Sequence, residues 1–415
     1  MEEGLKLDFK FEIHLQRLCL IKVAVSLWER KEIREKICVF FEELSSKEDD
    51  ILIRNWKFDL TKKVLSLMNN LPLPNFLINT LKHYVSSMGF QIYQWTKFVT
   101  KNLGFNIVCT DYIFWTHYGT IDKIQTFKYW YDHRILETSQ LFNVACIFCL
   151  EDYVPILWNE IPDEVRKNDF YLKKIYTFSI YSLIIYWKKR LGEEIEENFV
   201  SFIHSEEWEK ILTLRRAGLL KRDENYHRKM SWLEFCHESF SIEENMYRGA
   251  IIEGQELAVQ YFWNNLDERC QMRDFEDIML AIDREKNERG YSDILIFMMT
   301  RLKINKALPI LYSHSLWETL LRNFPFEEFF IMALDRALEL NKDYGILENK
   351  FFWSLVGTIL NRIDDERLLF DAGDVSVYEK ILQDMWDIIP ESARYWVAQN
   401  PSFYIQRGLR RRGLC

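Results

Sequence analysis

The sequence contains one segment twice, and this duplication constrains the fold more than any other feature. Residues 142–170 align without a gap with residues 247–275, which lie 105 positions later. Eight of the 29 aligned positions are identical, whereas ordinary residue frequencies would give about two. Repetition of a helical unit is typical of a stacked array, in which each unit buries its apolar face against its neighbours. We therefore predict an all-α protein built as an α-solenoid.

Each copy predicts two short helices joined by a turn. In the first copy, residues 141–150 form an apolar run, Glu151 and Asp152 mark the turn, and residues 153–160 form a second run. Asp152 is a candidate N-cap, which places Pro155 in the first turn of the second helix, where its missing N–H is tolerated. The residues that we predict to form the repeat core are Ala145, Val154, Trp158, Phe170, Ala250, Gly254, Val259, Trp263 and Phe275.

The repeats divide the sequence into three predicted parts. Residues 1–125 form an N-terminal helical region that is a cap or a separate lobe. Residues 126–345 hold the duplicated repeats, in blocks of about 126–240 and 241–345, and residues 346–415 form a C-terminal helical cap with a basic tail. Atypical caps are expected at both ends, because terminal units of an array must meet water on one face.

Three local predictions concern these flanking regions. Asn70-Leu71-Pro72 predicts a turn between two apolar helices, because proline cannot continue a helix, and Asn323-Phe324-Pro325 echoes it. Three glycines in an aromatic-rich stretch predict helices with short breaks over residues 86–128; they are Gly89, Gly104 and Gly119. The basic residues 407–415 lack a pattern and predict a frayed tail.

The second copy carries the motif of a known family. Ala250 is followed by the Gly254-Gln255 pair and by the apolar helix that contains Ala258-Val259. This order resembles an ankyrin repeat, in which an alanine-bearing helix leads through a Gly-His pair to a second apolar helix. The resemblance implies stacked helix-turn-helix pairs that bind a partner rather than catalyse a reaction. The sequence is also similar to divergent ankyrin-like proteins of arthropods and nematodes, and this similarity implies no known activity.

The sequence departs from the ankyrin pattern at three points. The usual Thr-Pro-Leu-His opening is absent, Cys149 stands at the glycine position of the first copy, and Gln255 stands where histidine is usual. These departures, together with extra bulky aromatics, leave the β-hairpin fingers of the family without sequence support. The resemblance covers about 60 residues, in the two copies.

Composition narrows the class of protein. With 30 Phe, 20 Tyr and 14 Trp against only 14 Gly and 8 Pro, the sequence favours long helices over turn-rich β architecture. A net charge of −9 argues against broad binding to nucleic acid or anionic membrane. The longest near-apolar run, residues 175–187, is too short to cross a bilayer and predicts a buried helix. Because the eight cysteines lack framework spacing and no signal peptide is legible, we predict free thiols and a cytoplasmic protein.

No catalytic, cofactor or metal motif emerges from the residue pattern. Cys146 and Cys149 form a CxxC pair, but they lie inside an apolar helix, so we interpret them as core residues rather than a redox or zinc site. Cys236-His237 lacks the geometry of a nucleophile–base pair, because adjacent helical residues point in different directions. The carboxylates of residues 193–197 are interpreted as a solvated helix face.

Two further motifs keep open alternatives. Trp158 and Trp263 are predicted to face the core between repeats, and the alternative is a role at an interface, where tryptophan is enriched. Arg410, Arg411 and Arg412 are interpreted as a solvated tail, and the alternatives are an acidic surface or a nuclear address.

The duplication and the missing motifs lead to one functional prediction. We expect a non-enzymatic intracellular scaffold or adaptor that binds one or more proteins, with no cofactor, no membrane and no nucleic acid as partner. One alternative is a helical enzyme or small-molecule binder whose site is assembled from distant helices. A further alternative is nucleic-acid binding through a basic stripe, which would be salt-sensitive.

Overall fold

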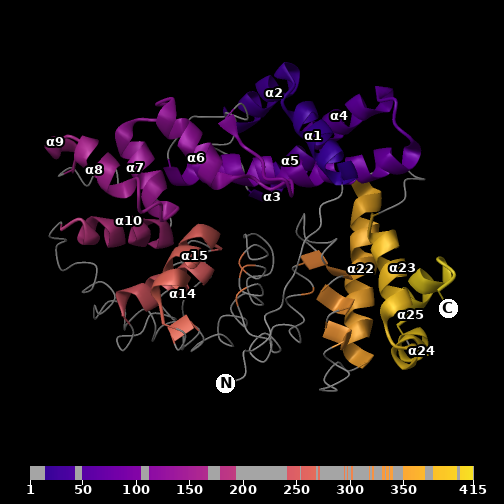
Figure 1. Cartoon of the computed structure of the whole chain (residues 1–415). Helices are drawn as coiled ribbons and strands as arrows, with labels where there is room; N and C mark the ends of the chain where they lie inside the picture. The colour runs from indigo at the N-terminus through magenta and orange to yellow at the C-terminus, as the bar shows by residue number, and fades with distance from the viewer. Residues whose placement is uncertain are drawn as a thin grey trace, which may run out of the picture. The chain divides into compact units, whose positions relative to one another are not determined.

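The computed structural model describes the chain as a series of helices (Figure 1). The described residues are 15–42, 49–103, 112–166, 178–192, 241–252, 254–267, 270–271, 349–369, 377–399 and 402–414, with isolated helical positions between 294 and 339. Across these ranges, the only pairing of extended backbone is an isolated antiparallel bridge between Trp115 and Ile121. The prediction of an all-α chain is therefore confirmed.

Contacts divide the chain into two compact units. Unit 1 comprises Met1–Lys97, Val108–Asp122 and Leu295–Cys415, and unit 2 comprises Phe98–Ile107 and Lys123–Ile294. Both copies of the duplicated segment lie in unit 2. The division of the sequence at residues 125 and 345 stays a prediction.

The N-terminal part of unit 1 is a run of closely spaced helices. They are α1 (Leu15–Trp28), α2 (Lys31–Glu42), α3 (Asp49–Asn55), the π-helix η2 (Trp56–Thr61), α4 (Lys62–Ser66), the 3-10 helix η3 (Leu67–Asn70) and the long helix α5 (Asn75–Leu103), whose residues from Phe98 onward belong to unit 2. Pro72 and Pro74 lie between η3 and α5, so the predicted proline-marked turn is confirmed. The echoing motif at residues 323–325 lies outside the described residues.

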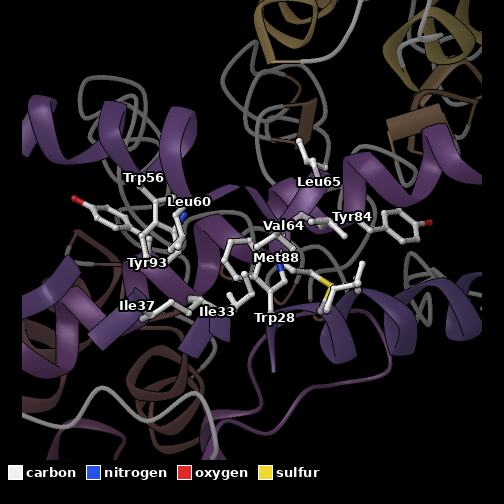
Figure 2. Packing of buried hydrophobic residues seen from close by; sticks show 14 of the residues in the cluster. Trp28, Ile33, Ile37, Trp56, Leu60, Val64, Leu65, Tyr84, Met88 and Tyr93 are labelled. Atoms are coloured by element: carbon white, nitrogen blue, oxygen red, sulfur yellow. Dashed lines mark hydrogen bonds between the residues drawn. The ribbon is translucent and has the colours of Figure 1, made fainter. Parts of the chain in front are cut away.

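Aromatic and aliphatic side chains together form the core of the N-terminal part of unit 1 (Figure 2). The rings of Trp28 and Trp56 stack with centroids 5.7 Å apart and planes 3° apart. Tyr93 of α5 lies 5.4 Å from Trp56, and Phe41 of α2 lies 5.8 Å from it. Full burial of such a side chain contributes about 1.5–3 kcal/mol to stability. The core therefore joins α1, α2, η2 and α5 through one aromatic cluster.

Gly89 allows α1 to approach α5 closely. A Cβ atom at Gly89 would overlap the indole ring of Trp28, whose Nε1 donates a hydrogen bond to the Val85 carbonyl oxygen at 2.9 Å. Gly89 lies inside the uninterrupted helix α5, so the predicted break at this glycine is wrong. The residue provides space for a ring rather than a turn. Gly119 does lie in a turn, with a φ of 86°, and Gly104 lies outside the described residues.

The π-helix η2 lies within a continuous helical path from α3 to α4. Buried residues recur at every fourth position along it, at Trp56, Leu60, Val64 and Met68. In a regular α-helix of 3.6 residues per turn, a spacing of four moves each successive side chain further round the axis. The wider π turn offsets part of this rotation. The inserted turn therefore keeps all four side chains on the core.

The C-terminal part of unit 1 contains α22 (Asn349–Leu369), α23 (Val377–Ile388), α24 (Glu391–Gln399) and α25 (Phe403–Arg410). Helix α22 packs against each of the other three, and α22 and α23 run side by side (Figure 1).

The prediction of a frayed tail is wrong, because Phe403–Arg410 form helix α25. The Oγ of Ser402 accepts a hydrogen bond from the N–H of Ile405, which caps the helix, and the side chains of Ile405 and Leu409 are buried. These two apolar residues are four positions apart and hence on one face. The pattern was present in the sequence but hidden among arginines.

Unit 2 contains α6 (Lys123–Asp132), α7 (Thr138–Ile147), α8 (Val154–Glu160), α9 (Asp163–Arg166), α10 (Phe178–Arg190), α14 (Ile242–Ile252) and α15 (Glu256–Asn265). Helix α7 pairs with α8 and α14 pairs with α15, while α10 packs against both α7 and α14. In α10, Leu183, Ile184, Tyr186 and Trp187 are buried. The predicted buried helix over residues 175–187 is therefore confirmed for its described part.

Candidate functional site: two equivalent helical hairpins

The duplicated segment folds twice into a helical hairpin. The first hairpin is α7–α8 and the second is α14–α15. The first helices end at Ile147 and Ile252, and the second helices end at Glu160 and Asn265, so both pairs of ends are 105 residues apart. Helix α8 is shorter at its start than α15. It begins at Val154, which aligns with Val259, whereas α15 already begins at Glu256. Pro155 accounts for this difference, because proline is tolerated only in the first turn of a helix.

The turns of the two hairpins have the same hydrogen bonds. In each, one N–H reaches back five residues and the preceding N–H reaches back three, which is the pattern of a Schellman motif. The bonds are Leu150 N–H to the Ala145 carbonyl (2.9 Å), Cys149 N–H to the Cys146 carbonyl (3.2 Å), Gln255 N–H to the Ala250 carbonyl (2.8 Å) and Gly254 N–H to the Ile251 carbonyl (3.0 Å). The aligned residues therefore have equivalent backbone roles.

The left-handed residue of each turn occupies the same aligned position. Gly254 has a φ of 68° and Cys149 has a φ of 51°. This backbone region is open to glycine but costs other residues about 1–2 kcal/mol. Cys149 therefore keeps the geometry of the glycine that it replaces, at some expense in stability.

A tryptophan packs against an aromatic ring in each hairpin. The ring centroids of Phe142 and Trp158 are 5.0 Å apart with planes at 38°, and those of Tyr247 and Trp263 are 6.1 Å apart with planes at 56°. Both pairs join the first helix of a hairpin to the second. The two indoles are nearly completely buried, with 6% and 7% of their surface exposed.

Most of the predicted repeat-core residues are buried in these hairpins. Ala145, Val154 and Trp158 are buried in the first hairpin, and Ala250, Val259 and Trp263 are buried in the second. Gly254 is half-buried in its turn. Phe170 and Phe275 lie outside the described residues. The role of these residues in a longer stack stays a prediction.

The start of α8 differs from the predicted one. Tyr153, rather than Asp152, is the N-cap residue, and its side chain makes no capping hydrogen bond. The ring of Tyr153 instead packs edge-on against Phe127 at 5.1 Å and Tyr131 at 5.0 Å. Packing against α6 therefore fixes this end of the helix. Pro155 does lie in the first turn, as predicted.

Helix α10 packs on the second hairpin through aromatic rings and an arginine. Tyr186 lies edge-on to Phe262 at 5.1 Å, and Trp187 lies 5.2 Å from Tyr261. Arg190 Nη1 donates hydrogen bonds to the hydroxyls of Tyr261 (2.6 Å) and Tyr186 (3.1 Å). Burial, followed by the bond with Tyr186, raises the pKa of Tyr261, so its hydroxyl remains a neutral acceptor. Sequence reasoning missed Arg190, although its spacing of four from Tyr186 was a signal.

The same helix meets the first hairpin at a different face. Lys188 Nζ lies 5.7 Å from the ring centroid of Trp158, and α10 also packs against α7. On the second hairpin α10 covers Tyr261, whose aligned counterpart is Ile156 rather than Trp158. One helix thus contacts the tryptophan side of one hairpin and the opposite side of the other. This is a head-to-tail arrangement.

The head-to-tail order leaves one position of the first hairpin uncovered. Ile156 has 47% of its surface exposed, whereas its counterpart Tyr261 is half-buried beneath α10. Asn159 and its counterpart Asn264 are both exposed. We call Ile156 and Asn159 together the end face of α8.

The CxxC pair lies in the core. Cys146 and Cys149 are free thiols and are buried. Burial raises the pKa of Cys146 well above its ordinary value of 9.0 and raises the pKa of Cys149 to about 12. A reactive cysteine needs the opposite shift, because the thiolate is the nucleophile and the metal ligand. Both thiols therefore stay protonated near neutral pH, as core residues do.

The other sequence candidates give no site in the described part of the chain. Cys236, His237 and the carboxylates of residues 193–197 lie outside it. Among the described residues, no group of three or more His, Cys, Asp or Glu side chains is arranged to hold a metal ion. Within the same residues, no helix is both long and apolar enough to cross a membrane.

Comparison with known proteins identifies no relative of this chain. No protein-family model matches the sequence, and neither curated proteins nor solved structures include a match.

Proposed function

We propose that this chain is a non-enzymatic scaffold that binds other proteins through a stack of degenerate ankyrin-like helical hairpins. The observation that carries the proposal is the equivalence of the two hairpins, which keep the same turn and the same buried tryptophan at a spacing of 105 residues. Helical stacks of this kind typically bury a continuous core and offer their remaining faces to partners. The free thiols, among them Cys19 and Cys270, fit a reducing compartment, so we assign the scaffold to the cytosol.

The end face of α8 is the surface that we assign to the partner. At the aligned position on α15, the neighbouring helix α10 packs aromatic side chains against Tyr261. Ile156 offers an apolar side chain with the same placement on α8, and 47% of its surface is open. A partner helix with bulky apolar side chains would extend the head-to-tail order by one element. Helix-in-groove recognition of this type relies on apolar anchors at helical spacing.

The test compares two exposed isoleucines of unit 2. Ile156→Arg changes the end face, whereas Ile124→Arg changes an isoleucine on α6 that is 37% exposed. Surface substitutions of this kind change stability by roughly 0.5 kcal/mol or less, so both variants should keep the melting temperature. Tagged wild-type protein and both variants are purified from the native cell, and bound proteins are quantified by mass spectrometry.

We expect at least one partner to be retained by the wild type and by Ile124→Arg, and to be lost with Ile156→Arg. Direct binding of that partner, produced recombinantly, should show the same order. If every bound protein persists with Ile156→Arg, or if the wild type retains none, the proposal fails.

A further inference from the structure

A pocket of about 130 Å³ lies between α22 and the C-terminal helix α25 in unit 1. Its lining combines one aliphatic side chain with several charged ones. The lining residues are Leu360, Asp364, Tyr404, Arg407, Gly408, Arg411 and Arg412.

The wall formed by α25 is held firmly in place. A Cβ atom at Gly408 would lie 2.7 Å from the methyl groups of Leu360, so glycine is needed for the close approach of α25 to α22. After the helix, Leu414 N–H bonds to the Leu409 carbonyl at 3.1 Å and Gly413 adopts a φ of 67°, which closes the end in a Schellman motif. The arginines of the pocket therefore project from a fixed backbone.

The charges of the pocket are only partly neutralised. Arg412 bonds through Nη2 to Glu379 at 3.1 Å and through Nη1 to the Gly408 carbonyl at 2.8 Å. Asp364 accepts a hydrogen bond from the Tyr404 hydroxyl at 3.0 Å. Within the described part of the chain, Arg407 and Arg411 have no carboxylate partner.

Arg407 and Arg411 are four residues apart, so their exposed side chains lie on the same face. Like charges at this spacing repel, and a bound anion relieves the repulsion. The planar guanidinium group matches a carboxylate through two parallel hydrogen bonds. The pair thus forms a donor-rich rim above the aliphatic surface of Leu360.

We propose that this pocket binds a carboxylate side chain from an acidic segment of a protein partner. The inference takes from the proposed function only that the partner is a protein, and it does not depend on the end face of α8. The pocket is far smaller than the roughly 300–1,000 Å³ of a typical small-molecule site. Arginine and tyrosine, both present at its rim, are the residues that most often dominate binding energy at protein interfaces.

A singly charged carboxylate fits better than a phosphate or a nucleic acid. The carboxylate of Asp364 lines the pocket and opposes a dianion more strongly than a monoanion. The rim also lies at the C-terminal end of α25, where the helix dipole is negative.

The experiment measures fluorescence anisotropy of a rhodamine-labelled peptide of alternating Glu and Ser with the full-length protein. The matched peptide carries Gln in place of Glu. Competing probes are a phosphoserine peptide of the same length and a single-stranded oligonucleotide. Arg407→Gln and Arg411→Gln remove the rim guanidinium groups, and Arg410→Gln removes an equal charge from the same helix outside the pocket lining.

We expect the Glu peptide to bind and the Gln peptide not to bind. Arg407→Gln and Arg411→Gln should each weaken binding at least tenfold, and Arg410→Gln less than about twofold, with melting temperatures unchanged. The proposal is overturned if the Glu peptide does not bind, if Arg410→Gln weakens binding as much as the rim variants, or if the phosphopeptide or oligonucleotide binds more tightly. It is also overturned if the chain self-associates through this site in place of binding the peptide.

Discussion

The two hairpins are alike inside and different outside. Both have the same Schellman turn and a tryptophan packed on an aromatic ring, although Cys149 stands in one turn and Gly254 in the other. At the position of Ile156 and Tyr261, however, one side chain is open and the other is covered by α10. The two hairpins therefore share the structure that depends on contacts within each hairpin, and they differ where the neighbouring helices differ. Four experiments test this interpretation, and they follow from the largest expected effect to the smallest.

Removal of either tryptophan should have the largest effect. Trp158→Ala and Trp263→Ala should each lower the free energy of unfolding by about 3–5 kcal/mol, because each deletes a buried indole and leaves a cavity. Urea unfolding measures the change, and Trp→Phe at the same positions should recover part of the loss. A loss below about 1 kcal/mol at one position would break the equivalence of the hairpins.

Alkaline pH should distinguish the hairpins through their turns. Burial raises the pKa of Cys149 from 9.0 to about 12, so the folded state keeps a proton that the unfolded chain releases. This stabilisation is full below pH 9 and is lost as the pH rises from 9 towards 12, by about 1.4 kcal/mol per pH unit. The turn of the second hairpin has Gly254 at the aligned position and contributes no such pH dependence, whereas Tyr261 of that hairpin, whose pKa is also raised, adds one only above its ordinary value of 10.0.

The variant Cys149→Ala isolates the contribution of the thiol. The difference in unfolding free energy between wild type and variant should shrink by about 1 kcal/mol between pH 9 and pH 10, measured by urea unfolding at each pH. A difference that stays constant over this interval would contradict buried protonation of Cys149.

Exchange of the turn residues should give a smaller, asymmetric effect. Gly254→Ala forces a side chain into the left-handed region and should lower the free energy of unfolding by about 1–2 kcal/mol. Cys149→Gly should change it by less than about 1 kcal/mol, because relief of the same strain offsets the lost burial of the thiol. Thermal unfolding measures both. Equal losses for the two variants would show that the turns are not equivalent in energy.

Arg134 should give the smallest effect. It ends α6 in the same type of turn, with a φ of 49°, and its Nη1 donates to Glu160 Oε2 at 2.8 Å. In a Glu160→Gln background, which removes the ion pair, Arg134→Gly should raise the free energy of unfolding by about 1 kcal/mol through relief of strain. Calorimetry of the double and single variants provides the comparison, and no gain would argue that this turn is unstrained.

The hairpins were largely predictable, because their signals are local. Aligned apolar positions indicated two helices per copy, and Pro155 marked the first turn of the second helix. The N-cap was not predictable, because Tyr153 is fixed by rings from α6 and not by its own hydrogen bonding. Tertiary packing overrode a capping preference there.

The errors in unit 1 have the same origin. Glycine usually interrupts a helix, but the role of Gly89 depends on its contact with Trp28, which lies 61 positions earlier in the sequence. The tail helix α25 depends on Ile405 and Leu409 meeting α22. Arg190 of α10 likewise bonds to Tyr261, which lies 71 positions later in the sequence. The spacing of four between Ile405 and Leu409, and between Tyr186 and Arg190, is visible in the sequence, but the distant residues that they contact are not.

The π-helix η2 also determines how this part of the chain tolerates insertions and deletions. Deleting one residue from Trp56–Thr61 would restore a regular helix without turning its two ends relative to each other, because the wider π turn already holds the extra residue at about the same total rotation. Trp56 and Val64 would then be one position closer in sequence, at a spacing of about two α-helical turns, and would still point into the same core. A one-residue gap placed here in an alignment with a related sequence is therefore compatible with unchanged core positions among the aromatic residues of α1, α2 and α5.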